Sequence, residues 1–147
     1  MTAQCSGRPY DLVRPFVGAW NEYSVANGEE VLLGTLESSL AQDGCVFTQS
    51  FSSADGNLSF MTFGFVDETN QWIETYVFND GRAASYRWRE EADEIITERI
   101  GGSASDMRRL RIRFVTTDLY EVSEERSLDR GKTWEFVELV RTRRVAS

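Results

Sequence analysis

The sequence predicts an all-β protein, an antiparallel up-and-down β-barrel of about ten strands that follows a short N-terminal helical turn. Runs rich in aromatic and β-branched residues recur along the chain, and turn dipeptides such as Asn27-Gly28 and Asp55-Gly56 separate them. No window shows the sustained periodicity of an amphipathic helix. A long meander of hairpins hides its unpaired edges most simply by closing on itself, which favours a barrel.

The expected elements follow from the turns. Pro9 and Pro15 limit the first segment to a short helical turn within residues 10–16, which would plug one end of the barrel. Tight turns are expected at Asn27-Gly28, Asp43-Gly44 and Asp55-Gly56. The strands are expected at 17–25, 30–41, 45–53, 58–66, 71–78, 82–89, 93–100, 107–115, 119–128 and 133–143. The chain is then a single domain over residues 1–147, with residues 1–9 as a flexible arm.

The composition is that of a globular domain, with 41% hydrophobic and 12% aromatic residues in 147. The 16 basic and 24 acidic residues give a formal charge of -8, which argues against nucleic acid as a partner. No stretch is long and apolar enough for a membrane helix, and the N-terminus lacks the pattern of a signal peptide. We therefore expect a cytoplasmic protein with no membrane partner.

Several kinds of chemistry are excluded or disfavoured. Cys5 and Cys45 are too few and too far apart in sequence to indicate a disulfide or a metal site, so we expect a free Cys5 and a buried Cys45. The sequence has no glycine-rich phosphate loop and no spaced ligand cluster, so neither a cofactor nor a metal is expected. Because the chain has no histidine, nucleophile pairs that depend on histidine are excluded.

Pairing the third to sixth strands through tight turns divides their side chains into two faces. One face carries no charge, and we expect it to be buried: Phe47, Phe51, Phe60, Thr62, Ile73, Thr75, Val77, Tyr86 and Trp88. On the other face Glu74 falls opposite Arg87 as a cross-strand ion pair, among many aromatic residues. That face suggests a homodimer, through Phe63, Phe65, Trp72 and Tyr76. If the faces are instead reversed, Glu74 and Arg87 lie inside as a polar anchor for a ligand.

The same pairing fails between the first and third strands, because it places Trp20 on the face of Ser50 and not of Phe47. A bulge or bend in the second strand, near Gly34 or Ser38-Ser39, would restore the alternation.

The chain resembles the calycin superfamily, which includes the lipocalins, the fatty-acid-binding proteins and the ten-stranded barrels related to nitrobindin. The likeness rests on Gly18-Ala19-Trp20, which matches the Gly-x-Trp of that superfamily, and on a late arginine, Arg141 or Arg143. The resemblance implies that Trp20 lies at the closed end and that the arginine packs across it. The hairpin that runs from Phe63-Gly64-Phe65 to Gly81 looks like a bacterial group of such barrels. Nitrobindin-like proteins hold haem through a histidine, which this chain lacks.

A second string, from Ser127 to Trp134, is similar to the Asp-box hairpin of sialidases, Ser-x-Asp-x-Gly-x-Thr-Trp. In that family the box is a structural turn. Asp129 would bind backbone amides, Gly131 would take a positive φ angle, and Trp134 would cover the hairpin.

Three glutamates could supply acid-base chemistry. Glu22 lies two residues beyond Trp20 on the same face, while Glu121 and Glu138 share a face with Val140. A carboxyl group held in an apolar barrel has a raised pKa and can act as a general acid or base. Alternatively, residues 119–128 form a solvated strand whose glutamates pair with arginines of its neighbours.

These observations leave three functional hypotheses. The first is binding of a small, largely hydrophobic molecule inside the barrel. Its expected ligand-binding residues are Trp20, Glu22, Phe47, Phe51, Phe60, Tyr86, Arg87 and Trp88. The second is a cyclase or isomerase that uses Glu22 or a tyrosine as its acid-base group. The third is a solidly packed barrel that acts as an assembly module.

Overall fold

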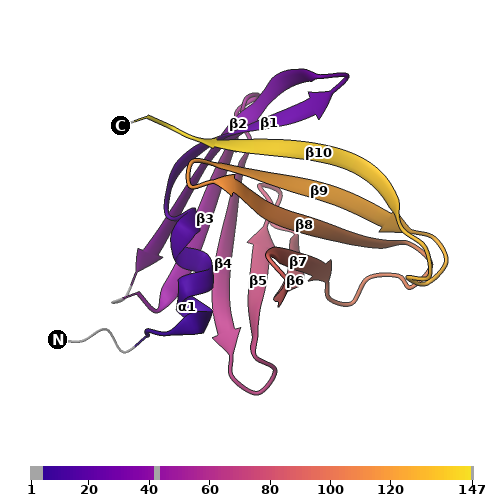
Figure 1. Cartoon of the computed structure of the whole chain (residues 1–147), viewed down its shortest axis with the longest axis horizontal. Coiled ribbons are helices and arrows are strands. Elements are labelled where there is room, and N and C mark those ends of the chain that lie inside the picture. The colour runs from indigo at the N-terminus through magenta and orange to yellow at the C-terminus, as the bar shows by residue number, and fades with distance from the viewer. Residues whose placement is uncertain (1–4, 42–43, 147) are drawn as a thin grey trace.

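The computed structural model describes residues 5–41 and 44–146, over which ten antiparallel strands close into one barrel (Figure 1). Strands adjacent in sequence pair with each other, and the last strand pairs with the first, so the predicted up-and-down barrel is confirmed. The closed meander is consistent with a calycin-like fold. The strands are β1 (Gly18–Ala26), β2 (Glu29–Ala41), β3 (Val46–Ser53), β4 (Leu58–Val66), β5 (Gln71–Val77), β6 (Ala83–Glu91), β7 (Glu94–Arg99), β8 (Met107–Thr116), β9 (Leu119–Ser127) and β10 (Glu135–Arg144).

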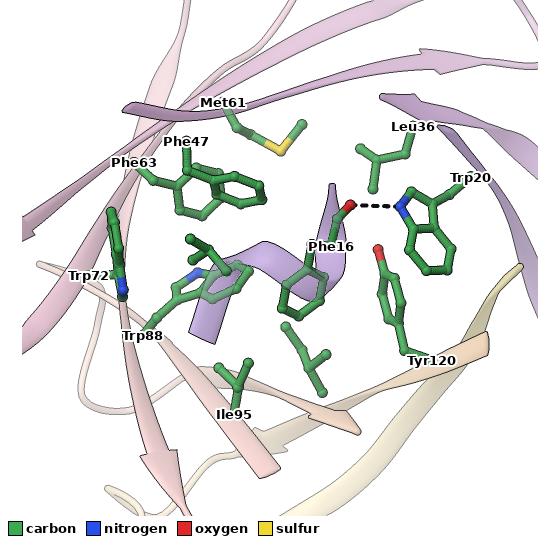
Figure 2. Packing of buried hydrophobic residues seen from close by; sticks show 12 residues of the cluster. Phe16, Trp20, Leu36, Phe47, Met61, Phe63, Trp72, Trp88, Ile95 and Tyr120 are labelled. Atoms are coloured by element: carbon green, nitrogen blue, oxygen red, sulfur yellow. Dashed lines mark hydrogen bonds between the residues drawn. The ribbon is translucent and has the colours of Figure 1, made fainter. Parts of the chain in front are cut away.

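A short helical segment closes one end of the barrel, as predicted. Helix α1 (Arg8–Val13) continues into a single 3-10 turn, Arg14–Phe16, and both Val13 and Phe16 are buried. Figure 2 shows the Phe16 ring inside the ring of strands, where it lies 5.1 Å from Tyr120 and 5.8 Å from Trp88 between ring centroids. Aromatic edges and faces therefore fill the closed end. None of the helical residues described forms a segment able to cross a bilayer.

Trp20 joins this plug to the first and last strands. Its indole Nε1 donates a hydrogen bond of 2.7 Å to the carbonyl oxygen of Phe16 (Figure 2), and the guanidinium of Arg144 stacks 4.1 Å from its ring. Arg144 also donates to the carbonyl oxygens of Val17 and Pro15. A Cβ atom at Gly18 would lie 2.5 Å from Nη1 of Arg144, so the glycine leaves room for the stacked arginine.

The arginine that packs across Trp20 is thus Arg144, and the expectation of Arg141 or Arg143 was wrong. Trp20 pairs directly with Arg144 across β1 and β10, whereas Arg141 and Arg143 lie on the outer face, where both contact Glu30. A difference of one residue in register decides which arginine reaches the interior.

The predicted break in alternation lies beside Gly34. Glu22 pairs with Gly34 and Tyr23 pairs with Leu32, so Leu33 is an extra residue in β2 and forms a bulge. The bulge places Trp20 opposite Leu36, which in turn pairs with Phe51 on β3. A side chain at position 34 would collide with the backbone oxygen of Ser52.

The faces predicted for β3 to β6 were partly wrong, because the predicted pairs, such as Glu74 with Arg87, imply two-residue loops in two hairpins where the structure has three residues. The first loop lies between Ser53 and Asn57 and ends at Gly56, and the second lies between Phe78 and Arg82 and ends at Gly81. Both glycines have a positive φ angle, as three-residue hairpin loops commonly require. The added residue shifts each pairing by one. The predicted Asp43-Gly44 turn cannot be compared, since Asp43 lies outside the described residues.

The shift moves several predicted residues across the wall. Phe60, expected inside, is 48% exposed on the outside. Arg87 pairs with Ile73 on the outer face, as the predicted pairing of the strands had it, so its alternative place as an inner anchor for a ligand is wrong. The residues predicted to form the dimer surface turn inward or pack under α1: Phe63, Phe65, Trp72 and Tyr76. The homodimer itself stays a prediction, but these side chains cannot form its surface.

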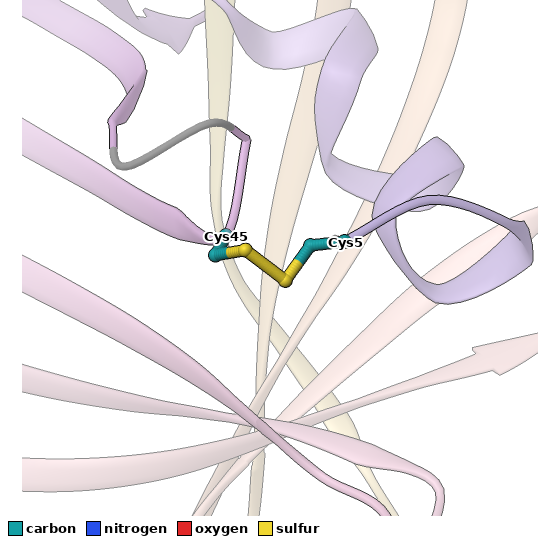
Figure 3. The surroundings of a disulfide bond; sticks show 2 residues. All are labelled: Cys5 and Cys45. Carbon is teal, nitrogen blue, oxygen red and sulfur yellow. A yellow bond between two sulfur atoms is a disulfide. The ribbon is translucent and has the colours of Figure 1, made fainter. Parts of the chain in front are cut away.

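Cys5 and Cys45 form a disulfide, so the expectation of two free cysteines was wrong (Figure 3). The bond ties the segment before α1 to the start of β3, with the two Cα atoms 5.0 Å apart across a sequence separation of 40. A crosslink over a loop of this size restricts the unfolded chain and so stabilises the fold. Such bonds are rare in the cytosol, so the cytoplasmic location remains only a prediction.

The Asp-box string forms the structural turn that the sequence predicts. Asp129 accepts hydrogen bonds from the backbone N–H and the hydroxyl of Thr133, and these bonds lower the pKa of its carboxyl to about 2. Gly131 has a φ angle of 84°, and its N–H donates to the hydroxyl of Ser127. Trp134 stacks 3.8 Å from the guanidinium of Arg109. These contacts account for the motif as a turn between β9 and β10.

We predict that Gly34→Ala destabilises the protein by roughly 1–3 kcal/mol or more, because the added methyl group must displace backbone at a bulge. The matched control is Gly64→Ala on β4, where an added Cβ meets open space. Urea unfolding of both variants measures the difference, and equal stabilities would contradict the close approach at Gly34.

Candidate functional site

A cavity of about 430 Å³ occupies the barrel interior. Its floor is formed by Phe16, Trp88 and Tyr120 at the closed end. At the other end it is lined by Arg99 and Arg108, whose side chains reach solvent. Small-molecule sites commonly have volumes of about 300–1,000 Å³, so the cavity has the size of a binding site.

The walls of the cavity are mainly apolar. Seven aliphatic, aromatic or thioether side chains line it from strands all round the barrel: Leu36, Phe51, Met61, Leu110, Ile112, Val122 and Val140. They contribute because alternate residues of every strand point inward. An apolar molecule that enters would exchange water for these side chains.

Glu22 projects into this apolar space from β1. Among the described residues no arginine or lysine lies within ion-pair distance of its carboxyl, and burial raises its pKa to about 7. The neighbouring bulge at Leu33 sets the alternation that points both Trp20 and Glu22 inward. The sequence therefore predicted the position and the electrostatic character of Glu22.

Glu74 projects into the same cavity from β5 and is only 8% exposed. Its Oε1 accepts a hydrogen bond of 3.0 Å from the indole N–H of Trp88. Burial raises the pKa of Glu74 to about 7, and the Trp88 bond opposes part of that rise. The predicted ion pair with Arg87 is absent, since Glu74 lies opposite Tyr86 in the register.

Tyr76 lies within electrostatic reach of both carboxyl groups. Burial raises the pKa of its phenol first, and the negative charges of Glu22 and Glu74 raise it further. Tyr120, at the floor, also has a raised pKa, mainly from burial and then from the charge of Glu22. The cavity therefore holds two carboxyl groups whose pKa values are about 7, beside phenols that stay protonated at neutral pH.

Thr97 on β7 adds a polar group that has no partner. Its side chain is 2% exposed and lines the cavity, and its Oγ1 makes no hydrogen bond with the described residues. It pairs with Trp88, the residue whose indole holds Glu74. A buried hydroxyl without a partner is costly, so a ligand atom here would be stabilised.

The charges at the open end are largely paired with each other. Arg108 contacts Glu124 at 2.9 Å and Arg109 contacts Glu125 at 3.1 Å. Glu138 accepts a hydrogen bond from the hydroxyl of Ser24. The positive and negative charges at the entrance are thus close to balanced. Glu22 and Glu74, further inside, make no ion pair with the described residues.

The structure brings together half of the residues predicted for the site. Four of them line the cavity: Glu22, Phe51, Tyr86 and Trp88. Trp20 and Phe47 are instead fully buried in the packing at the closed end. Phe60 and Arg87 lie on the outer face. Trp20 and Phe47 pack against Phe16 of the plug or its neighbours. Phe60 was misplaced by the loop at Gly56, whereas Arg87 lies on the outer face that the predicted strand pairing gave it.

The other glutamates considered from the sequence divide between the two surfaces. Glu121 pairs on the outside with Arg113 and Arg141, which agrees with a solvated strand and not with an acid-base role. Glu138 does line the cavity, near its open end.

Sequence reasoning placed Glu74 on an outer face, or inside only if the faces were reversed, and it did not consider Thr97. The signal for Glu74 was present in the alternation of β5, where the single acid stands between Trp72 and Tyr76 on one face. No signal in the sequence marked Thr97.

No protein-family model matches this chain, and no curated protein matches it. Within the described residues, no group of acidic or cysteine side chains is arranged to hold a metal ion.

Because Glu22 is buried, we predict that its titration lowers the free energy of unfolding as the pH rises from 4.5 to about 7. The folded-state pKa of about 7 exceeds the ordinary 4.5, so the folded state binds the additional proton in this window. The stability present below pH 4.5 is then lost as the pH passes 7, by about 3 kcal/mol for one such carboxyl.

Glu22→Gln removes this titration, because the amide stays neutral at every pH. Urea unfolding at several pH values measures the wild-type free energy minus that of the variant, and the difference should fall by about 3 kcal/mol across the window. Glu121→Gln, on the outer face, is the control for loss of one carboxyl. A difference that does not change with pH would contradict the burial of Glu22.

Proposed function

We propose that this protein binds a small, largely hydrophobic molecule inside its barrel. The observation that supports the proposal most is the cavity of about 430 Å³, which remains within a closed sheet although one end is filled by aromatic side chains. A barrel whose only purpose was stability would gain by filling this space, because a cavity costs packing energy. The solidly packed assembly module is therefore the weaker hypothesis.

The distribution of polar groups also supports binding. Apolar side chains surround the middle of the cavity, while a few polar groups, among them Glu22, Glu74 and Thr97, interrupt them. Sites for small molecules commonly combine apolar walls with a small number of orienting polar groups.

The resemblance to lipocalin-like and nitrobindin-like barrels is part of the proposal. It now rests on Gly18-Ala19-Trp20 with Arg144 across the tryptophan ring. Barrels of this kind host many functions, so the resemblance supports an interior site without identifying its ligand.

The proposal predicts that the uncharged dye N-phenyl-1-naphthylamine gains fluorescence when it binds the purified protein. Val122→Trp adds a large side chain to the cavity wall and should reduce this gain severalfold. Ser123→Trp is the matched control, because the next residue of β9 points to the other face. Its dye binding should stay near that of wild type.

Both variants are first checked by urea unfolding, since overpacking can itself cost roughly 1–3 kcal/mol. Folded wild-type protein that gives no fluorescence gain would argue against an open apolar interior. Equal loss in both variants would argue against the cavity as the binding site.

A second candidate function, an isomerase or cyclase, is favoured by one observation. Glu22 and Glu74 have pKa values raised to about 7 and lie in an apolar cavity with Tyr76 nearby. A general acid or base works best when its pKa is near the working pH. We therefore propose acid-base catalysis on a bound hydrophobic substrate as the alternative.

The general-base strength of the cavity can be measured with 5-nitrobenzisoxazole, whose ring opens when a base removes its C–H proton. An ionised Glu22 or Glu74 should accelerate the reaction, with a rate that rises as the pH passes about 7. Glu22→Gln and Glu74→Gln should lower the rate, and Glu121→Gln should not. A wild-type rate equal to that of buffer alone would count against the catalytic alternative.

A further inference from the structure

Two carboxyl groups face the cavity from well-separated walls. In the closed sheet, β1 and β5 are separated by three strands on one side and five on the other, so Glu22 and Glu74 project from roughly opposite sides. Tyr76 lines the same cavity, and the charges of both acids contribute to its raised pKa. Two carboxyl groups therefore face one apolar space from different walls.

Neither of these two acids has a counter-charge from the described part of the chain. The arginines that line the cavity are Arg99, Arg108 and Arg109, and all three lie toward its open end. Arg108 and Arg109 are already paired with Glu124 and Glu125. Buried acids normally have a partner, because an isolated buried charge is costly.

Thr97 gives an independent indication that this region can bind a polar group. Its hydroxyl is buried, lines the cavity and has no hydrogen-bond partner among the described residues. Trp88 lies between it and Glu74, since Trp88 pairs with Thr97 and donates its indole N–H to Glu74. Only one oxygen of Glu74 is used in that bond.

We infer that the molecule bound in the barrel is an apolar amine whose ammonium group lies between Glu22 and Glu74, within reach of the Thr97 hydroxyl. This inference rests on the proposed binding function and names its ligand class. An ammonium group has several N–H donors and no acceptor, which suits a site made of carboxylate and hydroxyl oxygens. The hydrocarbon part then contacts the apolar wall.

An anionic ligand fits the same cavity poorly. Its charge would meet Glu22 and Glu74 in the interior, where like charges repel. At the entrance it would have to compete with Glu124 and Glu125 for Arg108 and Arg109, and of the three cavity-lining arginines only Arg99 makes no ion pair with the described residues. A neutral ligand fits the apolar walls but leaves both acids without a partner.

Binding of an ammonium group is also linked to protons. Near pH 6 both acids hold their protons for most of the time, and a bound cation favours the ionised forms, so binding should release protons. The other titratable groups that line the cavity are Tyr76, Tyr86, Tyr120, Glu124 and Glu138. The pKa values of the three tyrosines are raised above 10, which keeps them neutral here.

The test compares three probes with the same hydrocarbon chain, octylamine, octanol and octanoate, by isothermal titration calorimetry at pH 8. Octylamine should bind roughly tenfold or more tightly than octanol, and octanoate should bind most weakly. Glu22→Gln and Glu74→Gln should each reduce the advantage of octylamine over octanol. Glu121→Gln, which removes one negative charge from the outer face, should retain it.

A second measurement needs no variant. Octylamine titrations of the wild type at pH 6, in two buffers with different ionisation enthalpies, should report proton release, and octanol titrations should report none. Octanol that binds as tightly as octylamine, without proton release, would overturn the amine while leaving hydrophobic binding intact. Tightest binding of octanoate would also overturn it. If neither these probes nor N-phenyl-1-naphthylamine bind, the proposed function itself fails.

Discussion

The pairing of β1 with β10, held at the closed end by Trp20 and Arg144, is the constraint on which the interior depends. Without this pairing the sheet would have two open edges and no enclosed volume. The Trp20 indole N–H donates a hydrogen bond to the carbonyl oxygen of Phe16. The Arg144 guanidinium stacks on the Trp20 ring and donates to the carbonyl oxygens of Pro15 and Val17. One residue from each of the two closing strands thus fixes the helical plug, and the cavity begins where the plug ends.

Charged groups are distributed unevenly between the two faces of the barrel wall, and the proposed function rests on that distribution. Ion pairs cover the outer face of β8 to β10, where Glu121 and Glu125 each contact two arginines. Glu22 and Glu74 have no arginine partner within the part of the chain that the structure describes, and burial raises the pKa of each carboxyl to about 7. Their burial reduces stability at neutral pH, and proteins tend to keep destabilising polar groups where function needs them. Binding and catalysis are the two uses consistent with such groups.

The sequence was sufficient to predict the order of the strands, the closure, the plug and the inward position of Glu22, because alternation and turn chemistry are local properties. It also predicted a break in the alternation of β2, because Trp20 could not otherwise share a face with Phe47, but it left Gly34 and Ser38-Ser39 as alternative positions. It failed at Glu74 and Phe60, because an additional loop residue at Gly56 exchanges the faces of β4 and β5, and a second one at Gly81 restores the predicted faces of β6. A dipeptide such as Asp-Gly suits both loop lengths. The Cys5–Cys45 bond depends on a contact between distant segments, which spacing alone does not reveal.

The central claim is that the barrel interior holds two carboxyl groups that remain protonated well above the ordinary pKa of glutamate. The most direct measurement is a pH titration of the glutamate side-chain carboxyl carbons by NMR, with Glu22→Gln and Glu74→Gln used to assign the two resonances. We expect both resonances to titrate with midpoints near 7, far from the 4.5 of an ordinary glutamate. Midpoints near 4.5 for both would mean that these groups are hydrated or paired, and would contradict the account of the cavity.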